Sequence, residues 1–151
     1  MPLSFDGQRI LILGAGVTGN AVARSLTKRG AVVSMADENP AAQSEHRVIG
    51  AKDVVIKDFD SVVVSPGWRQ DHPLVVAAKA SGLSLLNEVD LAWQIKSEIA
   101  PGQKWLALTG TNGKTTTVEM VAAMLKRGGL KATACGNVGE TVIEVVDRAD
   151  A

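Results

Sequence analysis

The chain lacks several features that mark whole classes of protein. It has one cysteine in 151 residues, so no internal disulfide can form and a reducing compartment is expected. Tyrosine is absent and aromatic residues make up 3%, which argues against a stacking surface for single-stranded nucleic acid. No apolar run approaches the ~20 residues that a membrane-spanning helix needs, and residues 1–10 lack the pattern of a secretory signal. We therefore expect a cytoplasmic protein without membrane insertion.

The chain also lacks an excess of either charge. It carries 16 Lys and Arg residues against 16 Asp and Glu residues, so its formal net charge is zero. A dedicated nucleic-acid-binding protein would normally carry a basic surplus. Hydrophobic residues make up 46%, which is enough for a folded core. The composition indicates a globular protein that does not bind nucleic acid.

Apolar β-rich runs alternate with helical patterns along the chain, which predicts an α/β fold with a parallel sheet. Within the first hundred residues we expect strands at 9–13, 31–36, 60–64 and 84–86 and helices at 17–29, from residue 73 onward and at 88–98. Pro73 suits the first turn of its helix, and Asp71 or His72 is expected to cap it. The pattern predicts a Rossmann-like domain over residues 1–100.

Pro101 and Gly102 form a turn signal and a domain boundary, after which the pattern starts again. We expect strands at 105–108 and 130–134, glycine loops at 110–113 and 135–139, and helices at 114–127 and 140–148. A parallel sheet usually needs more strands than these two. Residues 101–151 are therefore expected to be the incomplete start of a P-loop α/β ATP-binding domain in a longer protein.

The first glycine loop, GAGVTG at 14–19, is a complete G-x-G-x-x-G between an expected strand and an expected helix. Its glycines allow a tight turn and close approach to a diphosphate, and the helix N-terminus offers free N–H groups. Asp37 ends the next strand, where a carboxylate can accept hydrogen bonds from a ribose or a base. The SPG turn at 65–67 ends a later strand on the same sheet edge. The sequence predicts a nucleotide-diphosphate site, for which NAD is also a candidate, and a turn without ligand is the plain alternative.

The second glycine loop, TGTNGKTT at 109–116, has the chemistry of a phosphate-binding loop. Backbone amides can surround phosphates, Lys114 can reach the terminal phosphates, and the Thr115 hydroxyl can ligate Mg²⁺. The loop departs from G-x-x-x-x-G-K-[ST], because Leu108 stands where the first glycine is expected. We expect Lys114 and Thr115 to be catalytic and Thr115 to be the metal ligand. The expected ATP-binding residues are Gly110, Thr111, Asn112, Gly113, Lys114, Thr115 and Thr116.

A G-x-G-x-x-G unit followed by TGTNGKTTT resembles the Mur ligase family, which makes the peptide of bacterial cell-wall precursors. SPG at 65–67 and NEVDL at 87–91 look most like the members that add D-glutamate to UDP-N-acetylmuramoyl-L-alanine. The muramate:L-alanine ligase is the alternative, although it typically has His where Asn112 stands. The resemblance implies a bacterial, cytoplasmic ligase that uses ATP and Mg²⁺ to form an amide through an acyl phosphate.

The resemblance also implies where the substrates bind, with Asp37 on the uracil. The residues implied in binding UDP-N-acetylmuramoyl-L-alanine are Gly14, Gly16, Val17, Thr18, Gly19, Asp37, Ser65, Pro66, Gly67 and Asn137. The family's acidic Mg²⁺ ligand, modified lysine, catalytic histidine and D-glutamate-binding domain are expected beyond Ala151, so this chain alone is expected to be inactive. Two other classes remain open: a non-enzymatic NAD-binding Rossmann module, against which the second loop counts, and a P-loop NTPase, which would need a further acidic strand.

Overall fold

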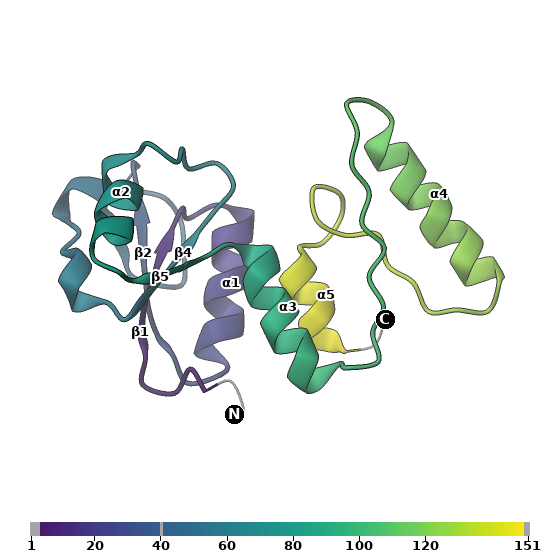
Figure 1. Ribbon diagram of the computed structural model, residues 1–151, viewed down its shortest axis with the longest axis horizontal. Helices are drawn as coiled ribbons and strands as arrows, with labels where there is room; N and C mark the ends of the chain where they lie inside the picture. Colours follow the sequence, from purple (N-terminus) through teal and green to yellow (C-terminus); the bar gives the residue numbers. More distant parts are fainter. Residues whose placement is uncertain (1–3, 40, 150–151) are drawn as a thin grey trace. The chain divides into compact units, whose positions relative to one another are not determined.

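The computed structural model describes residues 4–39 and 41–149. The chain divides into two compact units, residues 1–91 and 92–151 (Figure 1). The boundary expected at Pro101 and Gly102 falls inside the second unit and stays a prediction. No helix within the described ranges is long and apolar enough to cross a bilayer.

A parallel sheet forms the centre of the first unit, with strand order β3-β2-β1-β4-β5. The strands are β1 (Arg9–Leu13), β2 (Val32–Asp37), β3 (Val48–Gly50), β4 (Ser61–Val64) and β5 (Ser84–Leu86). The chain runs from β1 outward to β3 and then returns to the other side of β1 to begin β4. Strand order therefore reverses between β1 and β4, where ligands bind in open α/β sheets. The expected α/β fold with a parallel sheet is confirmed.

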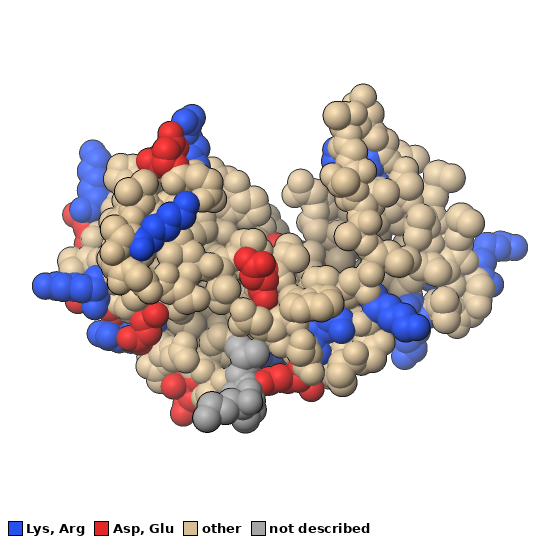
Figure 2. Space-filling model, viewed as in Figure 1, with Lys and Arg blue, Asp and Glu red and all other residues tan. Residues whose placement is uncertain are grey.

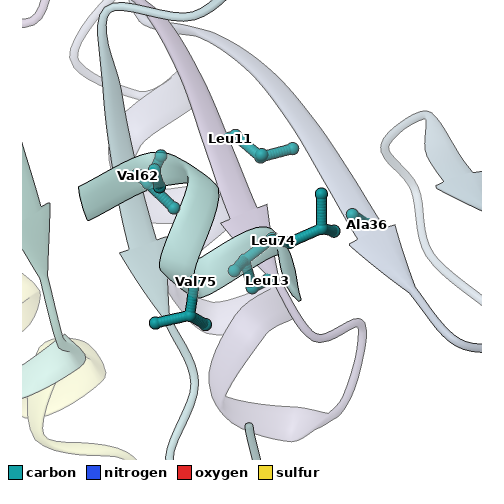
Figure 3. Close-up of a cluster of buried hydrophobic side chains, with 7 residues drawn as sticks. Leu11, Leu13, Ala36, Val62, Leu74 and Val75 are labelled. Carbon is teal, nitrogen blue, oxygen red and sulfur yellow. The ribbon is translucent and has the colours of Figure 1, made fainter. Parts of the chain in front are cut away.

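One face of the sheet is covered by α2 (Pro73–Ala80). Side chains alternate along a strand, so Leu11 and Leu13 lie on the same face of β1. Both are fully buried and pack with Leu74 and Val75 of α2 (Figure 3). His72 caps this helix as expected, because its Nδ1 accepts a hydrogen bond from the Leu74 N–H at 3.2 Å.

The opposite face of the sheet is covered by α1 (Val17–Thr27), which ends two residues before the expected position. Ile10 and Ile12 lie on this face by the same alternation, and both are buried, as are Val22 and Leu26 of α1. Helices cover both faces of the sheet, and in such a sheet ligands bind at the carboxyl ends of the strands.

The helix α3 (Glu88–Ile99) spans the division between the units, and its Leu91 and Ile95 are buried. Within the second unit, the Trp93 and Trp105 rings meet edge to face with centroids 5.1 Å apart. The Trp105 Nε1–H donates to Gln103 Oε1 at 2.9 Å. These contacts hold the connection that follows α3.

The second unit continues with α4 (Lys114–Arg127) and α5 (Val142–Arg148), which confirms both expected helices. A capping box begins α5: the Thr141 hydroxyl accepts from the Glu144 N–H, and the Glu144 carboxylate accepts from the Thr141 N–H. This reciprocal pair fixes where the helix starts.

The strands expected at 105–108 and 130–134 are wrong, because neither segment joins a ladder within the described residues. Leu106 is 71% exposed and Leu130 is 60% exposed, so neither side chain has a sheet face to pack on. A strand exists through hydrogen bonds to a neighbouring strand. Apolar β-rich sequence without such a neighbour remains irregular here.

Candidate functional site

The three glycines of the first loop have three different surroundings. A Cβ on Gly14, whose φ is +107°, would lie 2.9 Å from Ser65 Oγ and 3.1 Å from Trp68 Nε1. A Cβ on Gly19 would lie 1.9 Å from the Gly14 carbonyl oxygen, so this glycine lets α1 approach the end of β1. At Gly16 no atom of the described residues, apart from Gly16 and its two chain neighbours, lies within 4 Å of the Cβ position. Gly16 is therefore the glycine whose bare backbone is open to a ligand.

The loop's backbone donors divide into two sets. The Gly14 N–H donates to the Ala36 carbonyl at 2.7 Å, and the Ala15 N–H donates to Asp37 Oδ2 at 2.8 Å. The next donors begin α1, where an N-terminus carries a partial positive charge and free N–H groups suited to an anion. Within the described part of the chain, four consecutive N–H groups at the start of α1 have no hydrogen-bond partner: those of Gly16, Val17, Thr18 and Gly19.

Asp37 lies at the end of β2 as expected, but its carboxylate is already used by the protein. Its Oδ2 accepts from the Ala15 N–H at 2.8 Å and its Oδ1 accepts from the Asn39 N–H at 2.9 Å. Asp37 therefore holds the glycine loop and the chain that follows β2, a role that sequence reasoning missed. A carboxylate has lone pairs for further donors, so contact with a uracil stays a prediction.

The SPG turn follows β4 at the same edge of the sheet. The Ser65 N–H donates to the Leu13 carbonyl at 3.0 Å, and the Ser65 side chain faces Gly14. Pro66 and Gly67 are exposed. The structure thus brings the turn and the first glycine loop together, as the sequence predicted from the ends of parallel strands.

Three further side chains join this edge, and sequence reasoning gave none of them a role in the site. The Trp68 ring meets the His72 ring edge to face with centroids 4.3 Å apart. His72 Nε2 lies 3.6 Å from Glu38 Oε1. Because Glu38 follows β2 and His72 follows β4, this contact passes over the end of β1, which lies between those strands. The position of Glu38 directly after Asp37 was the available signal.

The second glycine loop ends at Gly113, whose φ of +74° suits a glycine at the N-cap of α4. The Lys114 ammonium folds over its own loop, donating to the carbonyl of Gly110 and, at 3.2 Å, to that of Thr111. All residues of 109–117 are exposed. In the described chain the first three N–H groups of α4 have no partner: those of Lys114, Thr115 and Thr116. A phosphate would find free donors and an exposed cation in the same loop.

No group of three or more His, Cys, Asp or Glu side chains that could hold a metal ion lies among the described residues. The exposed Thr115 hydroxyl, at the second position of α4, fits a Mg²⁺ ion whose other ligands are phosphate oxygens and water, as Mg²⁺ prefers. Asn137 is exposed in the loop at 135–140, which the Gly136 N–H closes onto the Glu140 carbonyl at 2.8 Å. The expected roles of Thr115 and Asn137 stay predictions.

Charges around the first unit are mixed. On its face shown in Figure 2, Lys and Arg side chains are interspersed with Asp and Glu. Close to the SPG turn, the Arg69 guanidinium binds the Asp71 carboxylate at 2.7 Å, and this hydrogen bond lowers the pKa of Asp71 below its ordinary value. The exposed pair is locally neutral, so it adds no net charge beside the turn.

The described chain thus has an α/β fold and two glycine loops, each of which joins a strand or extended segment to a helix with free N–H groups. Phosphate binding at the two loops stays a prediction. Only the second has a lysine and a threonine directly after its last glycine. Comparison with known proteins agrees with this description. The profile of the Mur ligase MurD-like N-terminal domain matches residues 8–87, and that of the Mur ligase middle domain matches residues 108–147. The chain belongs to the Mur ligase family.

Its relatives include UDP-N-acetylmuramoylalanine–D-glutamate ligases. The enzyme from Mycolicibacterium vanbaalenii is 42% identical, in an alignment that covers 97% of this chain and 32% of the relative. The enzyme from Corynebacterium efficiens is also 42% identical, in an alignment that covers 99% of this chain and 34% of the relative. A solved UDP-N-acetylmuramate–alanine ligase from Thermotoga maritima is 26% identical with a TM-score of 0.48, and 81% of this chain and 30% of that one are covered. The chain spans about a third of the length of the curated relatives it matches.

Proposed function

We propose that this chain supplies the nucleotide-binding parts of an ATP-dependent ligase that joins D-glutamate to UDP-N-acetylmuramoyl-L-alanine in peptidoglycan precursor synthesis. The observation that carries the proposal is the chemical difference between the two loops. The first has free N–H groups but no cation of its own, which suits a diphosphate that is held and not transferred. The second adds Lys114 and Thr115, which suit a triphosphate whose terminal group reacts. The names of the 42%-identical relatives support the same substrates.

In the first unit, the free N–H groups at the start of α1 bind the diphosphate of the UDP substrate over the bare backbone of Gly16. Val17, which is 78% exposed, and Thr18 contact the uracil or the diphosphate. Asp37 uses its remaining lone pairs for the uracil. The SPG turn at 65–67 lines the same pocket, and Asn137 of the second unit contacts the UDP-linked substrate.

In the second unit, the loop at 110–116 binds ATP. A carboxylate oxygen of the UDP-linked substrate attacks the γ-phosphorus, the bond from that phosphorus to the bridging oxygen breaks, and ADP leaves. The amine of D-glutamate then attacks the acyl carbon, inorganic phosphate leaves, and the amine loses a proton. Lys114 moves its ammonium from the loop carbonyls to the phosphates and offsets charge during the transfer. Bound Mg²⁺, held through Thr115, supplies further positive charge at the phosphates. ATP supply places this reaction in the bacterial cytoplasm.

Binding measurements on this chain test the first half of the proposal. We expect UDP-N-acetylmuramoyl-L-alanine and UDP to bind more tightly than NAD in calorimetric titrations, and ATP to bind in the presence of Mg²⁺. Tighter binding of NAD would contradict the assignment of the first loop.

Turnover by the full-length protein tests the second half. Phosphate release should require ATP, UDP-N-acetylmuramoyl-L-alanine and D-glutamate together. Release with UDP-N-acetylmuramate and L-alanine instead would assign the chain to the alanine-adding reaction of the same family.

A further inference from the structure

The side chain of Asn20 binds two carbonyl groups of the first glycine loop. Its Nδ2 donates to the Ala15 carbonyl oxygen at 2.7 Å and to the Gly16 carbonyl oxygen at 3.0 Å. The geometry is natural for the fourth residue of α1, because helix side chains lean toward the N-terminus. Two carbonyl dipoles beside the expected anion site are therefore turned onto an amide donor.

The other end of the same amide is held from a distant part of the sequence. The Ser44 hydroxyl donates to Asn20 Oδ1 at 2.6 Å, a shorter contact than the 3.1 Å to Met35 Sδ. Ser44 Oγ also accepts from the His46 N–H at 3.1 Å. These partners fix the orientation of the amide, since a flipped Asn20 would place its oxygen against two carbonyl oxygens.

Ser44 belongs to the segment that leaves β2 directly after Asp37. That segment is further ordered by the Asn39 N–H, which donates to Asp37 Oδ1 at 2.9 Å. One asparagine side chain thus connects the loop with free N–H groups to the segment expected beside the nucleoside. Sequence reasoning gave neither Asn20 nor Ser44 a role.

We propose that Asn20 is a positioning residue for the diphosphate of the UDP substrate, and that Ser44 holds it in place. The Gly16 carbonyl also accepts from the Asn20 backbone N–H at 3.0 Å, so the side chain acts chiefly on the Ala15 carbonyl. It fixes the Ala15–Gly16 peptide so that the Gly16 N–H faces the ligand. Without this side chain the Ala15–Gly16 peptide can rotate, because glycine resists rotation least, and the Ala15 carbonyl then replaces the Gly16 N–H beside the phosphates. The inference rests on the proposed function, because it takes the first loop as the UDP site.

The experiment compares binding of UDP and of uridine by NMR titration of the whole chain. Asn20→Leu keeps the side-chain size but removes both hydrogen-bonding ends. We expect it to weaken UDP binding by about tenfold, as for the loss of hydrogen bonds that order a charged ligand's site, with uridine affinity unchanged. Asn20→Asp should weaken UDP binding more than Asn20→Leu does, because it places a carboxylate against two carbonyls and near the phosphates. Thr27→Ala, at the far end of α1, is the matched control and should change neither affinity.

A second pair of variants tests the other end of the network. Ser44→Ala should weaken UDP binding by a few-fold, and Ser44→Thr, which keeps the hydroxyl, should restore it. If Asn20→Leu fails to fold, the two Ser44 variants still test whether the Asn20–Ser44 hydrogen bond supports UDP binding.

The outcomes separate this inference from the proposal on which it rests. Wild-type UDP affinity in Asn20→Leu and Ser44→Ala would overturn the positioning role and leave the proposed function standing. Equal weakening of UDP and uridine would show that Asn20 has only a general structural role. A wild-type chain that does not bind UDP would contradict the proposed function itself.

Discussion

At Gly16 a methyl group would enter open space, whereas at Gly19 it would meet the Gly14 carbonyl oxygen at 1.9 Å. The backbone of Gly16, with φ −77° and ψ −167°, is one that alanine adopts without strain. We therefore expect Gly16→Ala to leave the free energy of unfolding nearly unchanged but to weaken UDP binding, because the methyl group occupies the approach of the diphosphate. Gly19→Ala should lower the free energy of unfolding by about 1–3 kcal/mol through overpacking.

Urea unfolding and UDP titration of the two variants separate stability from binding. An unaltered UDP affinity in Gly16→Ala would show that the diphosphate does not pass over this residue.

In the second loop, substitution of Lys114 likewise separates an effect on stability from an effect on ligand binding. Its ammonium binds exposed carbonyls of its own loop, so Lys114→Met should change the unfolding midpoint little. Affinity for ATP with Mg²⁺ should fall by about 1.5–3 kcal/mol, the range for a hydrogen bond to a charged group. In the full-length protein, kcat should fall by at least ~10², as when other preorganised donors to a transition state are removed. Unchanged turnover in Lys114→Met would show that residues 110–116 form only a turn and take no part in the reaction.

Asp37 shows how far residue-level prediction can reach. Its place at the end of a strand, level with the glycine loop, follows from the alternation of apolar runs with turns. The identity of its partners does not, because the N–H groups of Ala15 and Asn39 come within reach only after β1 and β2 have paired. Asn20 and Ser44, 24 residues apart, meet for the same reason.

Among the helices, α5 depends most clearly on its cap. The Thr141 hydroxyl accepts from the Glu144 N–H, and Thr141 is 4% exposed. Thr141→Ala should lower the free energy of unfolding by about 0.5–2 kcal/mol. Thr117→Ala, at an exposed position inside α4, is the control and should have little effect or raise stability slightly. Equal unfolding midpoints in urea for Thr141→Ala and wild type would show that the capping box does not hold α5.

Arg9, the first residue of β1, pairs with Asp60, which directly precedes β4, and this charge pair predicts that stability depends on pH. Arg9 donates to Asp60 Oδ1 at 3.1 Å, and its hydrogen bonds lower the pKa of the Asp60 carboxyl below its ordinary value. The unfolded chain therefore binds this proton more readily, and the pair's contribution is present above about pH 4 and lost as pH falls further. Thermal unfolding from pH 6 to pH 2 should show a steeper decline for wild type than for Asp60→Asn. Parallel declines would show that the exposed pair contributes nothing measurable.

Helices were predicted better than strands, for a physical reason. The cap at His72 and the glycine loop that precedes α4 are local, so a short stretch of sequence contains them. Strands need partners: residues 105–108 have the composition of a strand but no ladder, whereas β3 has three residues and forms because β2 lies beside it. Composition cannot show which apolar segments will find a neighbour.

The two glycine loops, at 14–19 and 109–116, belong to different compact units, 1–91 and 92–151. Because the charge of Lys114 belongs to the second unit, Lys114→Met should leave the UDP affinity of the chain unchanged. Calorimetric titration with UDP measures this, with Gly16→Ala as the variant that does weaken UDP binding. Comparable weakening by both substitutions would mean that the two loops act as one site.

The chain has three tryptophans and no tyrosine, so each unit carries its own optical reporter. Trp68 belongs to the first unit, where its ring meets His72 and its Nε1 faces Gly14, so its emission should respond to nucleotide binding at that loop. Trp93 and Trp105 lie edge to face in the second unit, an arrangement that couples their excited states and should give a paired band in far-ultraviolet circular dichroism. Fluorescence and dichroism recorded on one unlabelled sample can therefore follow ligand binding in the first unit and loss of packing in the second as separate signals.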